Sequence, residues 1–186
     1  MKIKRTETIY NGFYTFRKVI LEDKGEEIER EQFDSGGAAA ALLYDTTQDK
    51  YIFVKQFRYS AETDLVEVVA GVVEDNDPEK TILKEIEEET GYKADHIEHI
   101  WDFFTSPGAC TEVVHLYYAE VSAKTEKGGG LDDEHENIEI ITLTEEELLS
   151  HPLSHPLRDA KTIIAVQWLA ARLGKIPQKQ ETSIKK

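Results

Sequence analysis

Three of the four carboxylates between Lys84 and Tyr92 offer the clearest chemistry in this chain. On a helix, Glu85 stands three and four positions before Glu88 and Glu89, so the three side chains share one face. Like charges at this spacing repel each other, and the dipole near a helix C-terminus also disfavours anions. A Mg²⁺ ion would compensate, because it takes carboxylate oxygens and leaves positions for water and phosphate. A solvated acidic face is the alternative interpretation.

The elements that must position these carboxylates can be predicted from the flanking residues. Asp77 caps a helix, Pro78 suits its first position, and Gly91 ends it. The preceding residues 65–69 predict a strand that ends at Ala70 and Gly71. One or two strands are expected in residues 8–22, and further strands in residues 27–33, 38–44, 51–57, 97–104, 113–121 and 138–143. Helices are expected from Thr144, through a capping box, and over residues 158–173. This order predicts an α+β fold, a mixed sheet covered by helices.

The composition narrows the class of protein. The chain has 186 residues, enough for one domain with a substantial core. Its 22 Lys and Arg against 37 Asp and Glu give a formal net charge of −15, which disfavours nucleic acid and anionic membranes as partners. No stretch predicts a membrane span or a signal peptide. The single cysteine, Cys110, excludes an internal disulfide and a cysteine-based zinc site, and a cytoplasmic compartment is expected.

The segment from Ala70 to Tyr92 closely resembles the Nudix box, which reads Gly, five residues, Glu, seven residues, Arg-Glu-apolar-X-Glu-Glu-X-Gly-apolar. The second half matches at every fixed position except that Lys84 stands where arginine is usual. The first half is one residue short, and Asp77 stands near the usual glutamate. The resemblance implies a loop-helix-loop that holds divalent metal ions against a diphosphate.

Further segments resemble the branch of the Nudix family that hydrolyses nucleoside diphosphate sugars, which includes ADP-ribose pyrophosphatases. They are residues 56–58, 106–112, 128–130, 136–138 and 158–162. The shortened box and the three-glycine loop most resemble the GDP-mannose hydrolases. The similarity runs from about Tyr10 to Gly174. It implies a single Nudix α/β/α sandwich over residues 1–174, with antiparallel strands in about residues 1–35 that take part in a homodimer, and a polar, basic tail at 175–186.

The resemblance also assigns metal ligands. Glu85, Glu89 and the backbone carbonyl of Ala70 are implied to bind Mg²⁺, which Mn²⁺ can replace. Glu88 is implied to bind a second ion or to orient the other carboxylates. Glu87 is the variable position and is expected to be solvated. Lys84 keeps the charge of the usual arginine but loses its fork, so weaker orientation of the glutamates is expected.

A general base is also expected, and in this branch it comes from the loop after the box. The matching position is Glu136, which lies close enough to the metal cluster in the resemblance to be a ligand as well. Three glycines upstream give the loop freedom to close over a substrate. Glu134 and Asp133 are the substitutes if Glu136 is only a solvated acid.

The substrate contacts implied by the resemblance are spread along the chain. Arg58 matches an arginine that reaches the diphosphate, often in the partner subunit's site, and Phe13 stands where an aromatic residue stacks on the base. The remaining candidates are Gly71, Glu112 and Lys161, together with Arg30 and Glu31, which fall where the partner subunit supplies base and sugar contacts.

These expectations predict a Mg²⁺-dependent enzyme that hydrolyses a nucleoside diphosphate sugar to NMP and a sugar phosphate. An ADP-ribose-specific pyrophosphatase is the alternative within that class, and a non-catalytic nucleotide-binding Nudix module is the alternative outside it. Retention of Glu85, Glu88 and Glu89 favours the enzyme. Ca²⁺ binding by residues 74–77 or 132–136 is disfavoured, because neither segment has the ligand and glycine spacing of an EF-hand. The prolines in residues 151–156 prevent His151 and His155 from sharing one helix face, which disfavours a metal site there. The sequence does not determine which nucleobase and which sugar the substrate carries.

Overall fold

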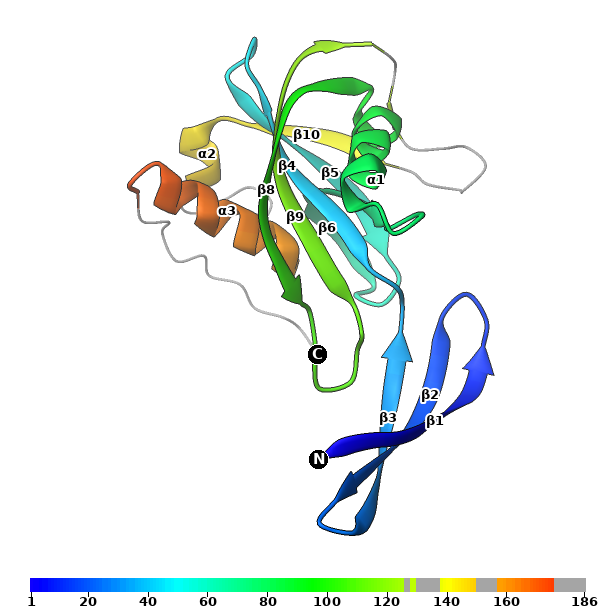
Figure 1. Ribbon diagram of the computed structural model, residues 1–186. Coiled ribbons are helices and arrows are strands. Elements are labelled where there is room, and N and C mark those ends of the chain that lie inside the picture. Colours follow the sequence, from blue (N-terminus) through cyan, green and yellow to red (C-terminus); the bar gives the residue numbers. More distant parts are fainter. Residues whose placement is uncertain (126–127, 130–137, 150–156, 176–186) are drawn as a thin grey trace.

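The computed structural model describes residues 1–125, 128–129, 138–149 and 157–175. Two sheets organise them (Figure 1). The first contains β1 (Lys2–Asn11), β2 (Thr15–Asp23) and β3 (Glu26–Asp34), paired antiparallel in that order. This N-terminal sheet extends from one end of the body and pairs only within itself among the described strands. Its strands confirm the predicted N-terminal antiparallel region.

The second sheet has seven strands and is mixed, as predicted. Its main path runs β10-β5-β4-β9-β8, with β6 paired to β5 and β7 paired to β4. β4 and β9 are parallel, whereas the other pairs are antiparallel. The strands are β4 (Ala38–Asp45), β5 (Lys50–Arg58), β6 (Thr63–Glu67), β7 (Val69–Val72), β8 (Tyr92–Phe104), β9 (Val113–Lys124) and β10 (Glu139–Leu143).

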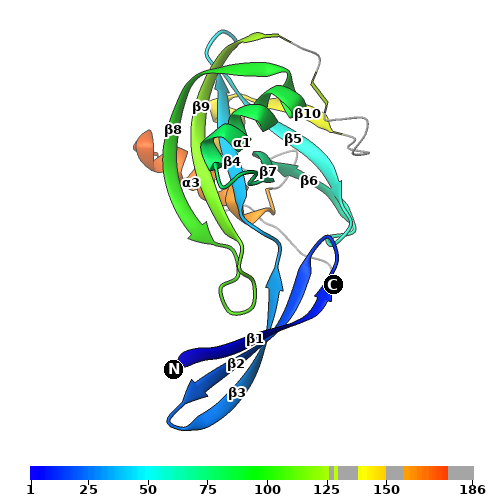
Figure 2. The same cartoon turned by 45° about the vertical axis from the view of Figure 1, so that its right-hand side comes forward.

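Helices cover both faces of this sheet (Figure 2). One face packs against α1 (Pro78–Glu85), and the other packs against α2 (Glu145–Leu149) and α3 (Ala160–Arg172). Successive residues of a strand point to opposite faces, so Leu42 enters the core beneath α3 while Leu43 enters the core beneath α1. The predicted α/β/α sandwich is confirmed. No helix in the described ranges is long and apolar enough to span a bilayer.

Two local differences from the sequence prediction fall beside the box. Residues 65–69 were expected as one strand, but β6 ends at Glu67 and β7 begins at Val69. The break at Val68 has a cause, since the Val68 amide donates to Thr162 Oγ1 of α3 at 2.9 Å rather than to a neighbouring strand. The helix predicted between the Asp77 cap and Gly91 is α-helical only to Glu85, after which residues 86–90 form a π-helical segment, η1 (Ile86–Thr90).

The N-terminal sheet is tied to the body through the loop between β8 and β9. The Phe33 amide donates to the Ala109 carbonyl at 2.8 Å, and the Thr111 amide donates to the Phe33 carbonyl at 3.0 Å. The Thr111 hydroxyl also donates to Asp34 Oδ1 at 2.6 Å. Val19, at the centre of β2, is buried.

Candidate active site

The box helix begins and ends as its sequence predicts. The Asp77 side chain accepts a hydrogen bond from the Lys80 amide at 3.0 Å, and Pro78 occupies the first turn. Gly91 ends the segment with φ 74°, a left-handed conformation that suits glycine. Ile82 and Ile86 are fully buried against the sheet. These two residues fix the helix, and so fix which of its side chains face the cavity described below.

The π-helical turn changes how the box carboxylates are presented. Glu85 is the last residue of α1, whereas Glu88 and Glu89 lie in η1. Glu89 is only 4% exposed, Glu88 is half-buried and Glu87 is exposed. The exposure of Glu87 fits its predicted solvation. A π-turn inside a helix is frequent at functional sites, because it redirects side chains that an α-helix would stack in line.

Gly71 makes room for Glu85. A Cβ built on Gly71 would lie 2.0 Å from Glu85 Oε1 and 2.2 Å from its Cδ. Gly71 and Ala70 are in β7, paired with Ala39 and Ala40 of β4. The Glu85 carboxylate therefore lies directly against the backbone of the loop entrance, next to Ala70, whose carbonyl is a predicted metal ligand.

Lys84 bridges the box loop and the box helix. Its Nζ lies 3.0 Å from Glu74 Oε1 and 3.8 Å from Glu88 Oε2. The hydrogen bond to Glu74 raises the pKa of Lys84, and the charges of Glu88 and Glu85 add to this. Among the three glutamates proposed as metal ligands, Lys84 thus forms an ion pair with Glu88, through a single charged nitrogen. This is expected for a residue that lacks the two parallel donors of an arginine.

A cavity of about 1020 Å³ brings most of the predicted site residues together. Its lining includes Phe13, Arg58, Ala70, Gly71, Glu85, Glu88, Glu112 and Lys161, all predicted from the sequence. Arg30 and Glu31 do not line it and belong instead to a separate hollow on the N-terminal sheet with Lys18 and Glu29. Glu136, Glu134 and Asp133 lie outside the described residues, as do His151 and His155.

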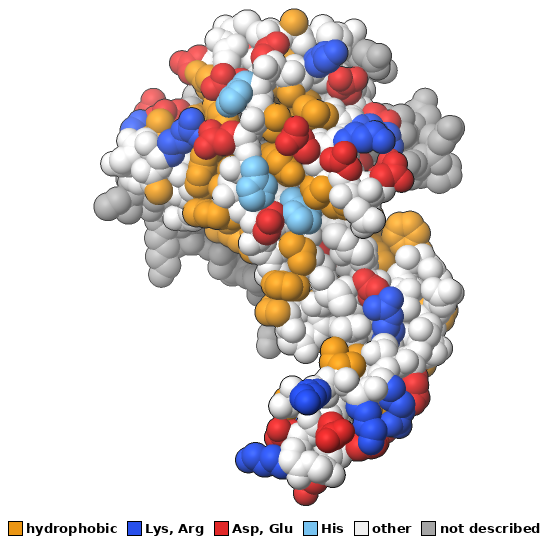
Figure 3. All heavy atoms as spheres, viewed as in Figure 1, with side chains coloured by type: hydrophobic (Ala, Val, Ile, Leu, Met, Phe, Trp, Pro, Cys, Tyr) orange, Lys and Arg blue, Asp and Glu red, His pale blue; other side chains and the backbone are white. Residues whose placement is uncertain are grey.

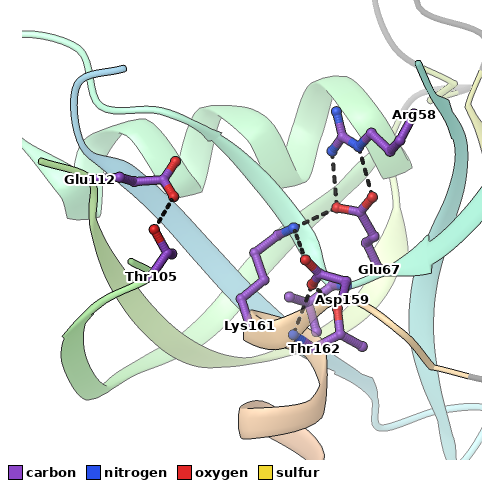
Figure 4. A network of polar contacts seen from close by, with 8 residues as sticks. Arg58, Glu67, Thr105, Glu112, Asp159, Lys161 and Thr162 are labelled. Carbon is purple, nitrogen blue, oxygen red and sulfur yellow. Dashed lines mark hydrogen bonds and ion pairs between the residues drawn. The ribbon is translucent and has the colours of Figure 1, made fainter. Parts of the chain in front are cut away.

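An ion-pair network around the buried Glu67 carboxylate forms one wall of the cavity (Figure 4). Glu67 is 2% exposed and accepts hydrogen bonds from Arg58 Nε at 2.7 Å and Arg58 Nη2 at 3.0 Å. Its second cationic partner is Lys161, whose Nζ also lies 3.1 Å from Asp159 Oδ1. Arg58 and Lys161 are therefore held in place by carboxylates and are not merely solvated surface residues.

The charges of this network shift one another's protonation. Burial raises the pKa of Glu67, but the hydrogen bond from Arg58 and the charge of Lys161 outweigh it, so the net direction is downward. The hydrogen bond to Glu67 raises the pKa of Arg58 against the opposing effect of burial, and the charges of Glu67 and Glu89 add to it. The carboxylate and the guanidinium are both ionised at neutral pH.

Two further contacts fix the remaining predicted groups. Asp159 caps α3, since its Oδ2 accepts from the Thr162 amide at 2.9 Å and from the Thr162 hydroxyl at 2.7 Å. Glu112 enters the cavity from the end of the loop between β8 and β9, and its Oε2 accepts from the Thr105 hydroxyl at 2.8 Å (Figure 4). The cap positions Lys161, which follows two residues after Asp159.

Sequence reasoning missed Glu67, Asp159, Tyr14 and Tyr59 as cavity residues. Glu67 had a signal, because it is a lone carboxylate within the apolar stretch 65–69. A charge in such a stretch is buried and needs a partner. Its partners Arg58 and Lys161 are distant in sequence, so only the fold reveals them. Tyr14 and Tyr59 gave no signal that separates them from ordinary surface aromatics.

The start of the glycine-rich loop packs against the C-terminal end of the box helix. The Gly129 amide donates to the Glu89 carbonyl at 2.7 Å. A Cβ on Gly128, whose φ is +68°, would lie 2.4 Å from the Thr90 carbonyl carbon. A Cβ on Gly129 would in turn lie 3.9 Å from the Ile138 carbonyl oxygen. Gly129 and Ile138, the residues on either side of 130–137, are therefore close together beside the box helix.

Comparison with known proteins identifies the family. The chain matches the NUDIX domain family over residues 34–165. It is 36% identical over 185 residues to a GDP-mannose pyrophosphatase from Cronobacter sakazakii, covering 92% of this chain and 96% of that one. It is 38% identical over 173 residues to a methanol dehydrogenase activator from Bacillus methanolicus, covering 90% and 91%. A solved structure of an ADP compounds hydrolase aligns with a TM-score of 0.76 at 16% identity, over 94% of this chain and 96% of that one, which shows a shared fold.

The chain belongs to the Nudix family. The predicted Nudix fold is confirmed, and so is the predicted class of enzyme, a hydrolase that acts on phosphorus-containing anhydrides.

Proposed function

We propose that this protein hydrolyses a nucleoside diphosphate sugar, of the GDP-mannose or ADP-ribose type, to NMP and a sugar phosphate in a Mg²⁺-dependent reaction. The observation that carries the proposal is the single cavity that joins the box carboxylates Glu85 and Glu88 to the cations Arg58 and Lys161. Carboxylates for a metal ion and cations for phosphate are the two groups that such a reaction needs. An ADP-ribose-specific pyrophosphatase is the alternative within the class.

The donor set of the box fits Mg²⁺. Glu85, Glu88 and Glu89 supply hard carboxylate oxygens, and the Ala70 carbonyl is the fourth donor of the same kind. Gly71 leaves the space in which the Glu85 carboxylate lies. We propose these residues as the ligands, with Mn²⁺ as a substitute ion. A bound divalent ion would lower the pKa of a water molecule and neutralise phosphoryl oxygens.

The charge balance of the cavity supports a requirement for the ion. Arg58 and Lys161 are matched by Glu67 and Asp159, with which they form ion pairs. The other carboxylates of the cavity, including Glu85, Glu88 and Glu112, add negative charge to the same space. A diphosphate entering this cavity alone meets net repulsion, so the proposed activity depends on a cation.

The cations position the diphosphate. Glu67 and Asp159 restrict the long side chains of Arg58 and Lys161, so that little rotamer freedom remains to be lost when phosphate binds. Arg58 lines the same chain's cavity as Glu85, which favours a role in its own subunit's site over the partner's. Glu112 accepts a hydrogen bond from Thr105 and is proposed to contact the substrate or the metal ions from the loop between β8 and β9.

Glu136 is proposed as the general base. It stands two residues before Ile138, which is buried in the core beneath α1. Both described flanks of residues 130–137 lie beside the box helix, Gly129 through its bond to the Glu89 carbonyl. The position of these two flanks supports the proposal that this segment supplies the base. Glu134 and Asp133 share the same segment and are the substitutes.

Aromatic side chains at the rim suit the nucleobase. Phe13 is 87% exposed, lines the cavity, and packs edge-on against Tyr14 with ring centroids 4.8 Å apart. Tyr59 also lines the cavity. Burial raises the pKa of Tyr14, and its contact with Tyr59 adds to this, so the two phenols lie together. A purine stacked on these rings would bury apolar surface now open to water.

We further propose a homodimer through the N-terminal sheet, in the cytoplasm. β1 is exposed along its whole length, and Ile3, Ile9, Tyr10 and Phe13 are apolar residues exposed at this end of the molecule. Arg30 and Glu31 lie on β3 of this sheet, away from their own chain's cavity. Any substrate contact from them would have to reach the partner subunit's site.

A regulatory role is the second candidate. The Bacillus methanolicus relative is named an activator of methanol dehydrogenase, at 38% identity over 90% of this chain. A nucleotide-binding module without catalysis would act in this way on a partner enzyme. The three retained carboxylates Glu85, Glu88 and Glu89 favour catalysis, since a module that only binds has no need of the complete set.

One panel tests the proposal. The purified chain is incubated with Mg²⁺ and, in turn, GDP-mannose, GDP-glucose, ADP-ribose, ADP-glucose and UDP-glucose, and the products are identified by mass spectrometry. The expected result is release of NMP and sugar phosphate from at least one substrate, abolished by EDTA and restored by Mg²⁺. Binding without turnover across the panel would replace this proposal with the regulatory one.

A further inference from the structure

A cluster of two histidines and one aspartate lies on the sheet outside the cavity. His99 Nε2 is 2.8 Å from Asp102 Oδ1, and His115 Nδ1 is 2.7 Å from the same oxygen. The three potential ligand atoms all lie within 4.8 Å of one another. None of the three residues lines the 1020 Å³ cavity. Figure 3 shows pale-blue histidine side chains next to a red acidic side chain on the face where β8 and β9 lie.

A bulge in β8 brings these residues together. Residues three apart on a regular strand point to opposite faces, so His99 and Asp102 should diverge. The pairing register shifts between His99 and Trp101, where β8 carries the extra residue Ile100. The bulge returns Asp102 to the face of His99 and places it opposite His115 of β9. Bulges commonly re-aim side chains in this way at functional sites.

The surroundings hold one histidine in place and leave the cluster open to water. The His99 ring packs edge-on against Tyr117, with centroids 5.3 Å apart, and Tyr117 belongs to the core beneath α1. His99 and Asp102 are about half exposed, at 48% and 51% for their side chains, so an ion and its water ligands can reach them.

We propose that His99, Asp102 and His115 bind one divalent transition-metal ion such as Zn²⁺. Imidazole nitrogens suit Zn²⁺, Cu²⁺ and Ni²⁺, whereas Mg²⁺ prefers oxygens, so this site and the box select different ions. Zn–N distances of about 2.0 Å in a tetrahedron separate ligands by about 3.3 Å. The two distances from the histidine nitrogens to Asp102 Oδ1 would need to open by about half an ångström from the present hydrogen bonds. The fourth position is left to water.

The ion would clamp β8 to β9. The loop that these strands flank carries Thr105 and Glu112 into the cavity and contacts Phe33 of the N-terminal sheet. A cross-strand link at the bulge would stiffen the two strands next to this loop. The site would therefore be structural, with one coordination position open to solvent.

Isothermal titration calorimetry with Zn²⁺ tests the site. The full chain carries Glu85→Gln and Glu89→Gln to weaken binding at the box, and millimolar Mg²⁺ is present throughout. The expected result is one Zn²⁺ per chain. In His99→Gln, Asp102→Asn or His115→Gln the affinity should fall by about 100-fold or more, because even outer contacts of metal ligands are worth 10–100-fold. His96→Ala, an exposed histidine on the same strand, is the matched control and should bind normally.

A thermal melt gives the second measurement. Zn²⁺ should raise the unfolding temperature of the parent and of His96→Ala, but not of Asp102→Asn, since an ion bound only to the folded state stabilises it. Melts without metal show that each variant folds. Absence of Zn²⁺ binding in the parent, or binding unchanged in all three ligand variants, would overturn the site and leave a hydrogen-bonded triad.

Discussion

The Glu85 side chain fills the space that any side chain at position 71 would need. A Cβ on Gly71 would meet Glu85 Oε1 at 2.0 Å, Cδ at 2.2 Å and Cγ at 2.6 Å. This glycine carries no left-handed φ, so its role is steric rather than conformational. The absence of a side chain at position 71 thus lets the Glu85 carboxylate, a proposed metal ligand, lie against the loop backbone.

Gly71→Ala should therefore disable the site without unfolding the protein. The added methyl meets a flexible side chain, which can rotate away, so the free energy of unfolding should change by about 1 kcal/mol or less. The displaced Glu85 should lower kcat about 10²-fold, as expected for a misplacement of roughly 1 Å at a catalytic centre. Kinetics and a chemical melt measure the two effects.

Gly108→Ala is the matched control for this substitution. A Cβ on Gly108 meets nothing within 4 Å, and its backbone is not left-handed. It should retain normal kcat and stability. Normal kcat in Gly71→Ala as well would show that the position of Glu85 does not matter to the reaction.

Glu85→Gln and Glu89→Gln should each raise the Mg²⁺ concentration needed for half-maximal activity by about tenfold or more and lower kcat, because the remaining carboxylates hold the ion less well. Folding should survive or improve, since each change relieves like-charge repulsion worth about 0.2–0.5 kcal/mol per pair. Glu87→Gln is the control, because Glu87 is exposed on the same segment. A Mg²⁺ titration that is identical in all three variants would contradict the ligand assignment.

The sequence predicted the identity of the box, the Asp77 cap and the Thr144–Glu147 capping box, because these depend on local patterns, and both caps are formed. It predicted the start of the last helix only to within Arg158 and Asp159, where Asp159 forms the cap. The π-turn after Glu85 was not predictable, since its residues have the same periodicity as an α-helix. The partners of Glu67 and the cluster at Asp102 depend on pairing between distant strands and on a bulge, neither of which a local pattern encodes.

Glu67 should make stability depend on pH at the acid end. Its folded-state pKa lies below the ordinary value of 4.5. Its ionised form therefore stabilises the fold fully above about pH 4.5, and this contribution is lost as the pH falls from there through the folded-state pKa. In Glu67→Gln the free energy of unfolding should drop by about 1–3 kcal/mol at neutral pH, because Arg58 and Lys161 lose a charged partner. Its dependence on pH below 4.5 should flatten.

Urea melts between about pH 3 and pH 7 measure this dependence, because this interval includes the usual pKa values of carboxylates. Glu146→Gln serves as the control, since Glu146 is an exposed carboxylate of α2. The control should match the parent at every pH. An unchanged acid slope in Glu67→Gln would show that the ion pair with Arg58 does not stabilise the fold.

The homodimer predicts which residues act across subunits. Light scattering at micromolar concentration should give the mass of two chains. A heterodimer of an Arg30→Ala chain with a Glu85→Gln chain should regain activity if Arg30 contacts substrate across the interface, because one of its two sites has both groups. The Arg58→Ala and Glu85→Gln pair should stay inactive, since Arg58 lines its own chain's cavity. A fully active monomer would contradict the dimer, and restoration by the Arg58 pair would place Arg58 in the partner subunit's site.

Glu136→Gln should separate the general base from the metal ligands. If Glu136 mainly activates water, kcat should fall by ~10²–10⁴-fold, the usual range for loss of a general base, while KM and the Mg²⁺ requirement stay near those of the parent. If it is also a ligand, the Mg²⁺ requirement should rise as it does in Glu85→Gln. Glu134→Gln and Asp133→Asn, in the same segment, are the matched controls and should retain most of the activity. Near-normal kcat in Glu136→Gln, with a large loss in one of these controls, would move the base to that neighbouring residue.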